Sequence, residues 1–428
     1  MRKVKIDQLD EKFLDYKEFK DMPEVEKIIE EVKQTGDEAV KKFTFEFDHV
    51  EIDQFKIERE EIECAYSLIQ KDFILNIKKV ANNVKNFSKK QLEAYKDFEF
   101  EIGPGVFVGQ KIVPIERVGV YVPGGRYPLV SSLIMGVIPA KIAGVKEVVV
   151  CSPPSCKGSL HPTIQVAADI SGVDEIYKIG GIQAIATMAY GTRSIKRVDK
   201  IVGPGNRYVN AAKKNVYGRV GIDFVAGPTE VLIIADKDAN PSFIAADLIA
   251  QAEHDVMAKP ILVTDSEELA TAVANEVKKQ LKNLKTARVA KQSLKHNGLL
   301  LIVNSMDLAI EFANRRAPEH LELNVKNPEP FLSRLKNYGS LFIGEYSAEV
   351  LGDYSSGLNH ILPTNYSSRY TGGLSVKDFI KIQTVLRVSE DGFLRIGPLA
   401  QNIAEAEGLY GHVNSVAIRM KNLDRASS

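Results

Sequence analysis

Apolar side chains recur at helical spacing through the first hundred residues. Two runs carry the pattern: Val25, Ile28, Ile29 and Val32 in the first, and Ile74, Ile77, Val80 and Val84 in the second. Steps of three and four residues place such side chains on one face of a helix. The pattern therefore predicts that this region is helical.

The pattern changes at about Val118 to short β-branched runs that alternate with Ala/Ile-rich stretches. The runs read VGVYV, EVVVCS, EIYKIG and KIVG, and after Gly227 a second series reads EVLIIAD, PILVTDS, LLLIVNS, LELNV and SLFIG. Apolar strands that alternate with helices are typical of a parallel sheet covered on both faces. The sequence therefore predicts an α/β fold with two Rossmann-like sheets.

Two segments follow the second series. A loop rich in glycine and tyrosine spans 344–373, and the last part of the chain opens with the helical-looking SVKDFIKIQTV. We expect a small C-terminal extension beyond the two sheets.

Length and charge narrow the class of protein. The chain has 428 residues, enough for two to four packed units at roughly 150 residues each. Lys+Arg and Asp+Glu both number 56, so the net charge is zero. Without a basic field to attract phosphates, we expect no nucleic-acid partner.

Targeting and redox signals favour the cytoplasm. The basic start MRKVKIDQLDEKF has no apolar core after it, so no signal peptide is expected. The longest apolar stretch, 129–145, contains Pro139 and Lys141, which favours a buried helix over a membrane span. The three cysteines, Cys64, Cys151 and Cys156, cannot all pair within one chain, which indicates a reducing compartment.

A helix is predicted over 240–254, with Asn240 as N-cap and Pro241 at the first helical position. Gln251 and His254 are three residues apart, so they share a face and can converge on one ion, whereas Glu253 points elsewhere. Metal ligation and a hydrogen-bonded polar helix end both fit this pattern.

Glu319 and His320 stand side by side in RRAPEHLELN, at the mouth of a predicted strand. Because successive strand residues point to opposite faces, Glu319 and His320 are expected to have separate chemical roles. Ligands bind beyond the ends of parallel strands, so the two side chains suit separate acid/base roles near neutral pH. A Glu-His pair that caps the surface is the alternative.

Two further segments hold candidate polar groups. LGDYSSGLNHILP carries Asp353, Asn359 and His360 in a loop, where Asp353 is either an anionic ligand or a turn residue. AEAEGLYGHVNSV carries Glu407 and His412 five residues apart, beside glycines that also fit a plain helix end.

Glycine turns recur at four places: 123–125, 180–181, 203–206 and 227–229. Each follows a predicted strand, the position from which backbone approaches a cofactor's phosphates or ring. G-x-G-x-x-G is missing, so the dinucleotide signal is weak. The motifs of P-loop NTPases, zincins and α/β-hydrolases are missing as well.

Eight segments in one order closely resemble the histidinol dehydrogenase family over nearly the whole chain. They are VGVYVPGGRYPLVSS, GGIQAIATMAYGT, KIVGPGNRYVNAAKK, AGPTEVLIIAD, LIAQAEHD, APEHLEL, GDYSSGLNHILPT and EGLYGHVNSVAIR. The family oxidises L-histidinol to L-histidine in two NAD-dependent steps through an enzyme-held aldehyde, with bound zinc, as the last stage of histidine biosynthesis. The resemblance implies this activity and the cofactors Zn²⁺, one per subunit, and NAD⁺.

The resemblance also implies residue roles. The zinc ligands would be Gln251, His254, Asp353 and, from the neighbouring subunit of a homodimer with shared active sites, His412. Glu319 and His320 match the catalytic pair. Thr229, His360 and Glu407 match residues that contact the substrate, and the metal ligands and the catalytic pair are expected to contact it as well. Tyr121, Gln183 and Asn206 match residues that contact the nicotinamide cofactor.

On this basis we expect four parts: an N-terminal segment, 1–22; a first α/β domain with most metal and catalytic residues, 23–120 plus 229–374; a second, cofactor-binding Rossmann-like domain, 121–228; and a C-terminal dimerisation and active-site extension, 375–428.

The chemistry fits these roles. A neutral imidazole such as His320 can take the alcohol proton as hydride leaves, and Glu319 can activate the water that hydrates the aldehyde. Zinc would hold the substrate's imidazole and amine.

Three positions depart from the family pattern and leave a related polar alcohol open as substrate. Thr229 stands where serine is frequent, Leu358 where threonine is common and Gly411 where alanine is usual. Two other classes also stay open: a metal-dependent hydrolase with Glu319 as base for water, and a non-catalytic sensor.

Overall fold

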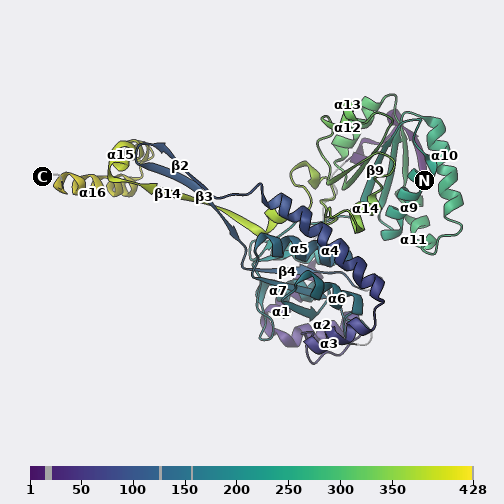
Figure 1. Cartoon of the computed structure of the whole chain (residues 1–428), viewed down its shortest axis with the longest axis horizontal. Coiled ribbons are helices and arrows are strands. Elements are labelled where there is room, and N and C mark those ends of the chain that lie inside the picture. Colours follow the sequence, from purple (N-terminus) through teal and green to yellow (C-terminus); the bar gives the residue numbers. More distant parts are fainter. Residues whose placement is uncertain (15–21, 125–127, 156–157, 427–428) are drawn as a thin grey trace. The chain divides into compact units, whose positions relative to one another are not determined.

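The computed structural model describes residues 1–14, 22–124, 128–155 and 158–426 (Figure 1). The predicted glycine turn at Gly125 and the third cysteine, Cys156, lie outside these ranges. The chain divides into two compact units, one of 1–90 with 115–379 and the other of 91–114 with 380–428.

The first unit contains a parallel sheet of six strands in the order β1-β11-β10-β9-β12-β13. Their bounds are Arg2–Lys5, Leu299–Ile302, Lys259–Thr264, Glu230–Ala235, His320–Asn324 and Ser340–Ile343. The predicted second series of strands is confirmed, and β1 adds a strand that the helical pattern did not indicate.

Both faces of this sheet are covered, which explains the continuous apolar run of β9. Val231 and Ile233 pack against α9 (Pro241–His254), α10 (Glu267–Gln280) and α11 (Ala287–His296). Leu232 and Ile234 pack against α12 (Met306–Arg316) on the other face (Figure 1). Alternate side chains thus enter two separate cores.

The second sheet of the first unit has five parallel strands in the order β6-β5-β4-β7-β8. Their bounds are Glu175–Lys178, Glu147–Ser152, Arg117–Tyr121, Lys200–Val202 and Gly221–Ile222. The α/β fold with two parallel sheets is therefore confirmed.

Six helices accompany this sheet: α1 (Pro23–Thr35), α2 (Asp37–Asp48), α5 (Val130–Ala143), α6 (Pro162–Ser171), α7 (Gly181–Tyr190) and α8 (Arg207–Val216). α5 is the apolar stretch predicted as a buried helix, and it is buried. Among the residues described, no helix is both long and apolar enough to cross a bilayer.

The packing of α1 and α2 differs from the predicted grouping of 23–120 with 229–374. Val25, Ile29 and Phe43 share one core with Val149 and Cys151 of β5. Both helices therefore belong with the five-stranded sheet, because their apolar faces are buried against α7 and α8. Periodicity marks such a face but does not say which sheet receives it.

The remaining helices of the first unit are α3 (Arg59–Ser67), α4 (Lys71–Leu92), α13 (Glu329–Leu332) and α14 (Glu349–Tyr354), with 3-10 turns at Ile6–Gln8, Glu11–Leu14, Ser367–Arg369 and Val376–Phe379. α3 packs on α6. α14 lies inside the segment predicted as a loop.

The second unit is an antiparallel sheet of three strands with two helices. The strands are β14 (Ile380–Val388), β3 (Val106–Pro114) and β2 (Phe98–Gly103), in that order, and α15 (Glu390–Ala406) packs on α16 (Tyr410–Ala426). The prediction that SVKDFIKIQTV is helical was wrong from Ile380 onward, where β14 begins, and Val376–Phe379 forms only a 3-10 turn. β14 pairs with β3 along its whole length, from Ile380 opposite Pro114 to Val388 opposite Val106.

Candidate active site

A cleft of about 570 Å³ in the first unit gathers most of the predicted reaction residues. Thr229 precedes β9, and Glu319 and His320 stand at the start of β12, so the cleft adjoins the amino ends of these strands. Ligand sites of parallel sheets usually lie at the carboxyl ends of the strands, so this cleft is at the opposite end of its sheet. α9 runs back from the far end of β9 and brings Gln251 and His254 to the same place.

Glu319 is held by two donors in a buried position. The Thr229 hydroxyl donates to Glu319 Oε2 at 2.5 Å, and the backbone N–H of Glu230 donates to the same oxygen at 2.9 Å. Burial raises the pKa of Glu319 to about 7 although both donors act to lower it. A carboxyl group with this pKa exchanges protons near neutral pH.

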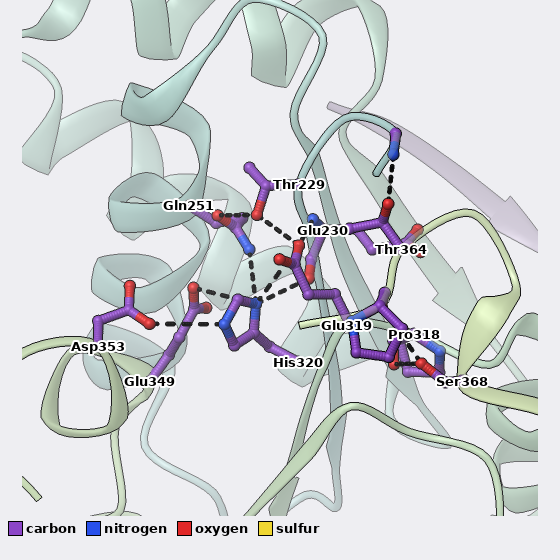
Figure 2. A network of polar contacts seen from close by, with 12 residues as sticks. Thr229, Glu230, Gln251, Pro318, Glu319, His320, Glu349, Asp353, Thr364 and Ser368 are labelled. Atoms are coloured by element: carbon purple, nitrogen blue, oxygen red, sulfur yellow. Dashed lines mark hydrogen bonds and ion pairs between the residues drawn. The ribbon is translucent and has the colours of Figure 1, made fainter. Parts of the chain in front are cut away.

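His320 lies among polar groups on both sides of its ring, as Figure 2 shows. Nδ1 is 3.2 Å from the amide nitrogen of Gln251 and 3.5 Å from Glu349 Oε1, and Nε2 is 3.5 Å from Asp353 Oδ1. Burial alone would lower the pKa of His320, but the charges of Glu349 and the other carboxylates hold it well above its ordinary value.

Both members of the Glu319–His320 pair line the cleft, although strand alternation predicted opposite faces. β12 begins at His320, so Glu319 precedes the strand and its side chain does not follow the pleat. Glu319 Oε2 is 3.8 Å from His320 Nδ1. The two groups therefore lie in one site.

Gln251, His254 and Asp353 line this cleft together. Loss of solvent around His254 lowers the pKa of its imidazole, which keeps it neutral. Burial would raise the pKa of Asp353, but the His320 imidazole, whose Nε2 lies 3.5 Å from Oδ1, lowers it, which keeps Asp353 ionised. An amide oxygen, a neutral imidazole and a carboxylate are the donor types that a divalent cation accepts, so the residues fit the expected metal.

Glu349 is a site residue that the sequence analysis missed. His320, Glu349 and Asp353 each offer a ligand atom, and these atoms lie within 4.8 Å of one another. Burial raises the pKa of Glu349 well above its ordinary value, and its Oε2 has no partner within the described chain. Its position four residues before Asp353, one helical turn away, was the available signal.

His360 connects the loop after α14 with α5. Its Nε2 lies 3.0 Å from the hydroxyl of Ser132, and its Nδ1 lies 3.0 Å from the backbone carbonyl of Asp353. Burial lowers the pKa of His360, so the ring is neutral and donates to the carbonyl through Nδ1.

A larger cavity of about 1130 Å³ lies at the carboxyl ends of the five-stranded sheet. Tyr121 ends β4, and its hydroxyl accepts the backbone N–H of Gly181 at 3.1 Å. Asn206 caps α8 by accepting from Tyr208 and Val209, and it lines this cavity as well as the cleft. Gln183 lies in the first turn of α7, fully buried, and neither of its amide atoms has a partner among the described residues.

The glycine turn after β7 is fixed by a buried ion pair. Lys213 pairs with Asp223, the Lys213 ammonium donates to the Gly203 carbonyl at 2.9 Å, and Asp223 accepts the Gly203 N–H at 2.8 Å. Gly203 has φ 116°, and a Cβ there would collide with the Tyr121 carbonyl. Glycine is thus required where the chain turns toward Asn206.

Comparison with known proteins decides the family. The histidinol dehydrogenase family model matches residues 14–420. The chain is 45% identical to histidinol dehydrogenase of Clostridium acetobutylicum over 92% of its own length and 91% of that protein, and 45% identical to the Methanocaldococcus jannaschii enzyme over 94% and 92%. The crystal structure of histidinol dehydrogenase from Elizabethkingia anophelis superposes with a TM-score of 0.94 at 38% identity, covering 99% of each chain.

The chain belongs to the histidinol dehydrogenase family. It is therefore an oxidoreductase, which favours this class over the hydrolase and the sensor left open by the sequence. The predicted resemblance is confirmed over nearly the whole chain.

Two residues with family-implied roles lie in the second unit. Glu407 follows α15 directly, and His412 lies in the first turn of α16. Both side chains are exposed in the single chain. Their roles in histidinol dehydrogenase chemistry stay predictions.

A second feature missed by the sequence analysis is a buried ion pair that supports the position of Glu319. Arg316 pairs with Glu230, with its Nε at 3.0 Å from Glu230 Oε2, and also donates to the Tyr366 hydroxyl at 2.8 Å. This buried pair fixes the first residue of β9, whose N–H holds Glu319.

Proposed function

We propose that this protein oxidises L-histidinol to L-histidine in two NAD-dependent steps through an enzyme-held aldehyde, the last stage of histidine biosynthesis. One observation carries the proposal: seven residues implied for the reaction line one cleft. They are Thr229, Gln251, His254, Glu319, His320, Asp353 and His360. They come from separate segments of the first unit, so their convergence is a property of the fold.

His320 serves as the base for hydride departure. Its neutral imidazole takes the proton of the alcohol while hydride passes from the same carbon to the nicotinamide ring. The surrounding carboxylates favour the protonated ring, so the neutral form requires positive charge nearby. The predicted metal site, which shares Asp353 with His320, is where that charge would lie.

Glu319 serves as the base for water between the two oxidations. The ionised carboxylate takes a proton from the water that adds to the aldehyde carbon, and the protonated His320 gives its proton to the aldehyde oxygen, which yields the hydrate and restores the neutral imidazole. His320 then accepts a hydroxyl proton of the hydrate as the second hydride leaves, and the carboxylate product forms. The pKa of about 7 for Glu319 suits a base that is regenerated near neutral pH.

Gln251, His254 and Asp353, with His412 of the partner subunit, would hold one zinc ion per subunit. When bound, zinc supplies a template that fixes the imidazole and amine of the substrate and places the reacting carbon opposite nicotinamide. The neutral His254, the ionised Asp353 and the amide oxygen of Gln251 support this role.

A homodimer with shared active sites follows from this ligand set, and the second unit supports association between copies. Several large apolar side chains of its sheet and helices are more than half exposed in the single chain: Phe98, Phe100, Ile102, Ile382, Leu386, Leu399 and Ile403. Apolar surface of this extent is typical of a protein interface.

NAD⁺ is the proposed oxidant, and the cavity beside the cleft is its proposed site. Three of the predicted glycine turns lie there, at the ends of β4, β6 and β7, with the N-termini of α7 and α8. Helix N-termini at the carboxyl ends of parallel strands suit a pyrophosphate.

The cytoplasm is the proposed compartment. Cys64 and Cys151, the cysteines that the structure describes, are both free thiols, which fits a reducing environment.

Absorbance at the NADH band tests the oxidation directly. We expect NADH to form when the purified protein, L-histidinol and NAD⁺ are mixed. His320→Asn should bind L-histidinol with nearly wild-type affinity and lose turnover. A wild-type protein that binds L-histidinol without forming NADH would support a sensor and contradict the proposal.

A further inference from the structure

Asp48 occupies an unusual position on the wall of the 1130 Å³ cavity. It is the last residue of α2, and its Oδ2 is buried without a hydrogen-bond partner among the described residues. A buried carboxylate oxygen without a hydrogen-bond donor lowers the stability of the fold. A bound ligand that donates a hydrogen bond to this oxygen would explain its position.

The position of Asp48 at the end of α2 further destabilises its negative charge. The C-terminus of a helix carries partial negative charge, and the last turn of α2 holds no basic residue. Burial raises the pKa of Asp48 to about 6. Nothing in the fold of α2 itself explains a carboxylate here.

The cavity wall around Asp48 carries further negative charge. Glu24, Glu31 and Glu46 also line it, against Lys27. Glu31 is partly neutralised, because Lys42 donates to it at 2.6 Å. This side of the cavity therefore favours a ligand with a neutral hydroxyl donor and repels one with an additional phosphate.

The position of the catalytic cleft decides which part of a dinucleotide reaches Asp48. Asn206 and Tyr208 line both cavities, so the nicotinamide ring must lie at this shared edge to receive hydride. In the described chain, residues of α1 and α2 line only the larger cavity. The adenosine half therefore extends toward α1 and α2.

Tyr121, which ends β4, lines the same cavity as Asp48. The carboxylate of Asp48 therefore shares a cavity with the end of that strand.

We propose that Asp48 accepts hydrogen bonds from the hydroxyls of the adenosine ribose and is the residue that selects NAD⁺ over NADP⁺. The inference rests on the proposed use of a nicotinamide dinucleotide. A free 2′-hydroxyl donates to the carboxylate, whereas a 2′-phosphate places negative charge against it.

Binding measured without turnover tests this assignment. NADH fluorescence and calorimetry with NAD⁺ and NADP⁺ should be compared for the wild type, Asp48→Asn, Asp48→Ala and the matched control Glu38→Gln, which alters an exposed carboxylate of α2 that does not line the cavity. We expect both Asp48 variants to bind NAD⁺ at least tenfold more weakly, because each loses about one charge-assisted hydrogen bond to the ribose. Their preference for NAD⁺ over NADP⁺ should shrink, and the control should resemble the wild type.

Thermal melting separates this role from a structural one. Because the Asp48 carboxylate is unpaired at a helix C-terminus, Asp48→Asn should melt at the wild-type temperature or above in the absence of cofactor. Unchanged NAD⁺ affinity and preference in the Asp48 variants would overturn the inference, as would a lower melting temperature. A wild type that binds NADH but does not oxidise L-histidinol would contradict the proposed function and leave this test intact.

Discussion

Glu319 and His320, neighbours in the chain, present Oε2 and Nδ1 to each other at 3.8 Å in one buried site. Each group titrates under the charge of the other. The positive imidazole lowers the pKa of Glu319, and the carboxylate raises the pKa of His320. Two bases in one buried site are suited to a reaction in which proton removal from an alcohol and from water must alternate.

The oxidation of the aldehyde should depend on pH through Glu319. Burial raises the pKa of Glu319 to about 7, so the carboxyl keeps its proton below that pH and cannot accept one from water. The rate of L-histidinal oxidation should therefore rise from pH 6 to 8 and then level off. Stopped-flow measurement of NADH formation checks this. A flat profile over that range would contradict the role of Glu319 as base.

Thr229 provides the control for this profile. Its hydroxyl donates to Glu319 at 2.5 Å and favours the ionised form. Thr229→Val should shift the rise of the profile to higher pH, whereas Thr229→Ser keeps the donor and should retain the wild-type position. Identical shifts in the two variants would mean that shape, not the hydrogen bond, sets the pKa of Glu319.

Removal of a predicted zinc ligand should remove metal without unfolding the protein. His254→Asn and Asp353→Asn should lose bound zinc and activity, while far-UV circular dichroism stays unchanged because the core is formed by the two sheets. Elemental analysis of the purified variants measures the metal.

Glu349→Gln distinguishes the two donor sets of the cleft. If Gln251, His254 and Asp353 hold the ion, this variant should retain it. Loss of zinc in Glu349→Gln would instead assign the ion to His320, Glu349 and Asp353, whose ligand atoms also cluster.

The buried Arg316–Glu230 ion pair should contribute strongly to the free energy of unfolding. Arg316→Met leaves the Glu230 carboxylate buried and unpaired, which should cost about 3–5 kcal/mol of unfolding free energy. The neighbouring exposed Arg315→Met should change it by less than about 0.5 kcal/mol. Denaturant unfolding measures both, and equal effects would show that the pair does not support the strand.

Shared active sites predict complementation between two inactive variants. In a hybrid dimer of His412→Asn and His320→Asn chains, one of the two sites has an intact His320 and an intact partner His412. Equal mixing should therefore restore about a quarter of wild-type activity. Each variant incubated alone is the control, and a mixture as inactive as its components would exclude ligation across the interface.

The sequence predicted those parts of the fold whose signals are local. The run EVLIIAD gave β9, and Asn240 with Pro241 marked the start of α9, which ends at His254 as expected. The convergence of Gln251, His254 and Asp353 was implied by family resemblance, and the fold places all three in one cleft.

The rest depended on contacts between distant segments. β14 is a strand because it pairs with β3, far earlier in the chain, and its own residues also fit a helical pattern. Glu349 has no motif of its own, and it becomes a site residue only because α14 sets it 3.5 Å from His320. Asp48 likewise gains its environment from the five-stranded sheet, against which α2 packs.

The yield of NADH from a limiting amount of L-histidinol tests the central claim most directly. With excess NAD⁺, the account predicts two NADH per L-histidinol, and L-histidine as the sole organic product. A yield of one NADH with accumulated aldehyde, or no NADH at all, would contradict the assignment of both oxidations to this cleft.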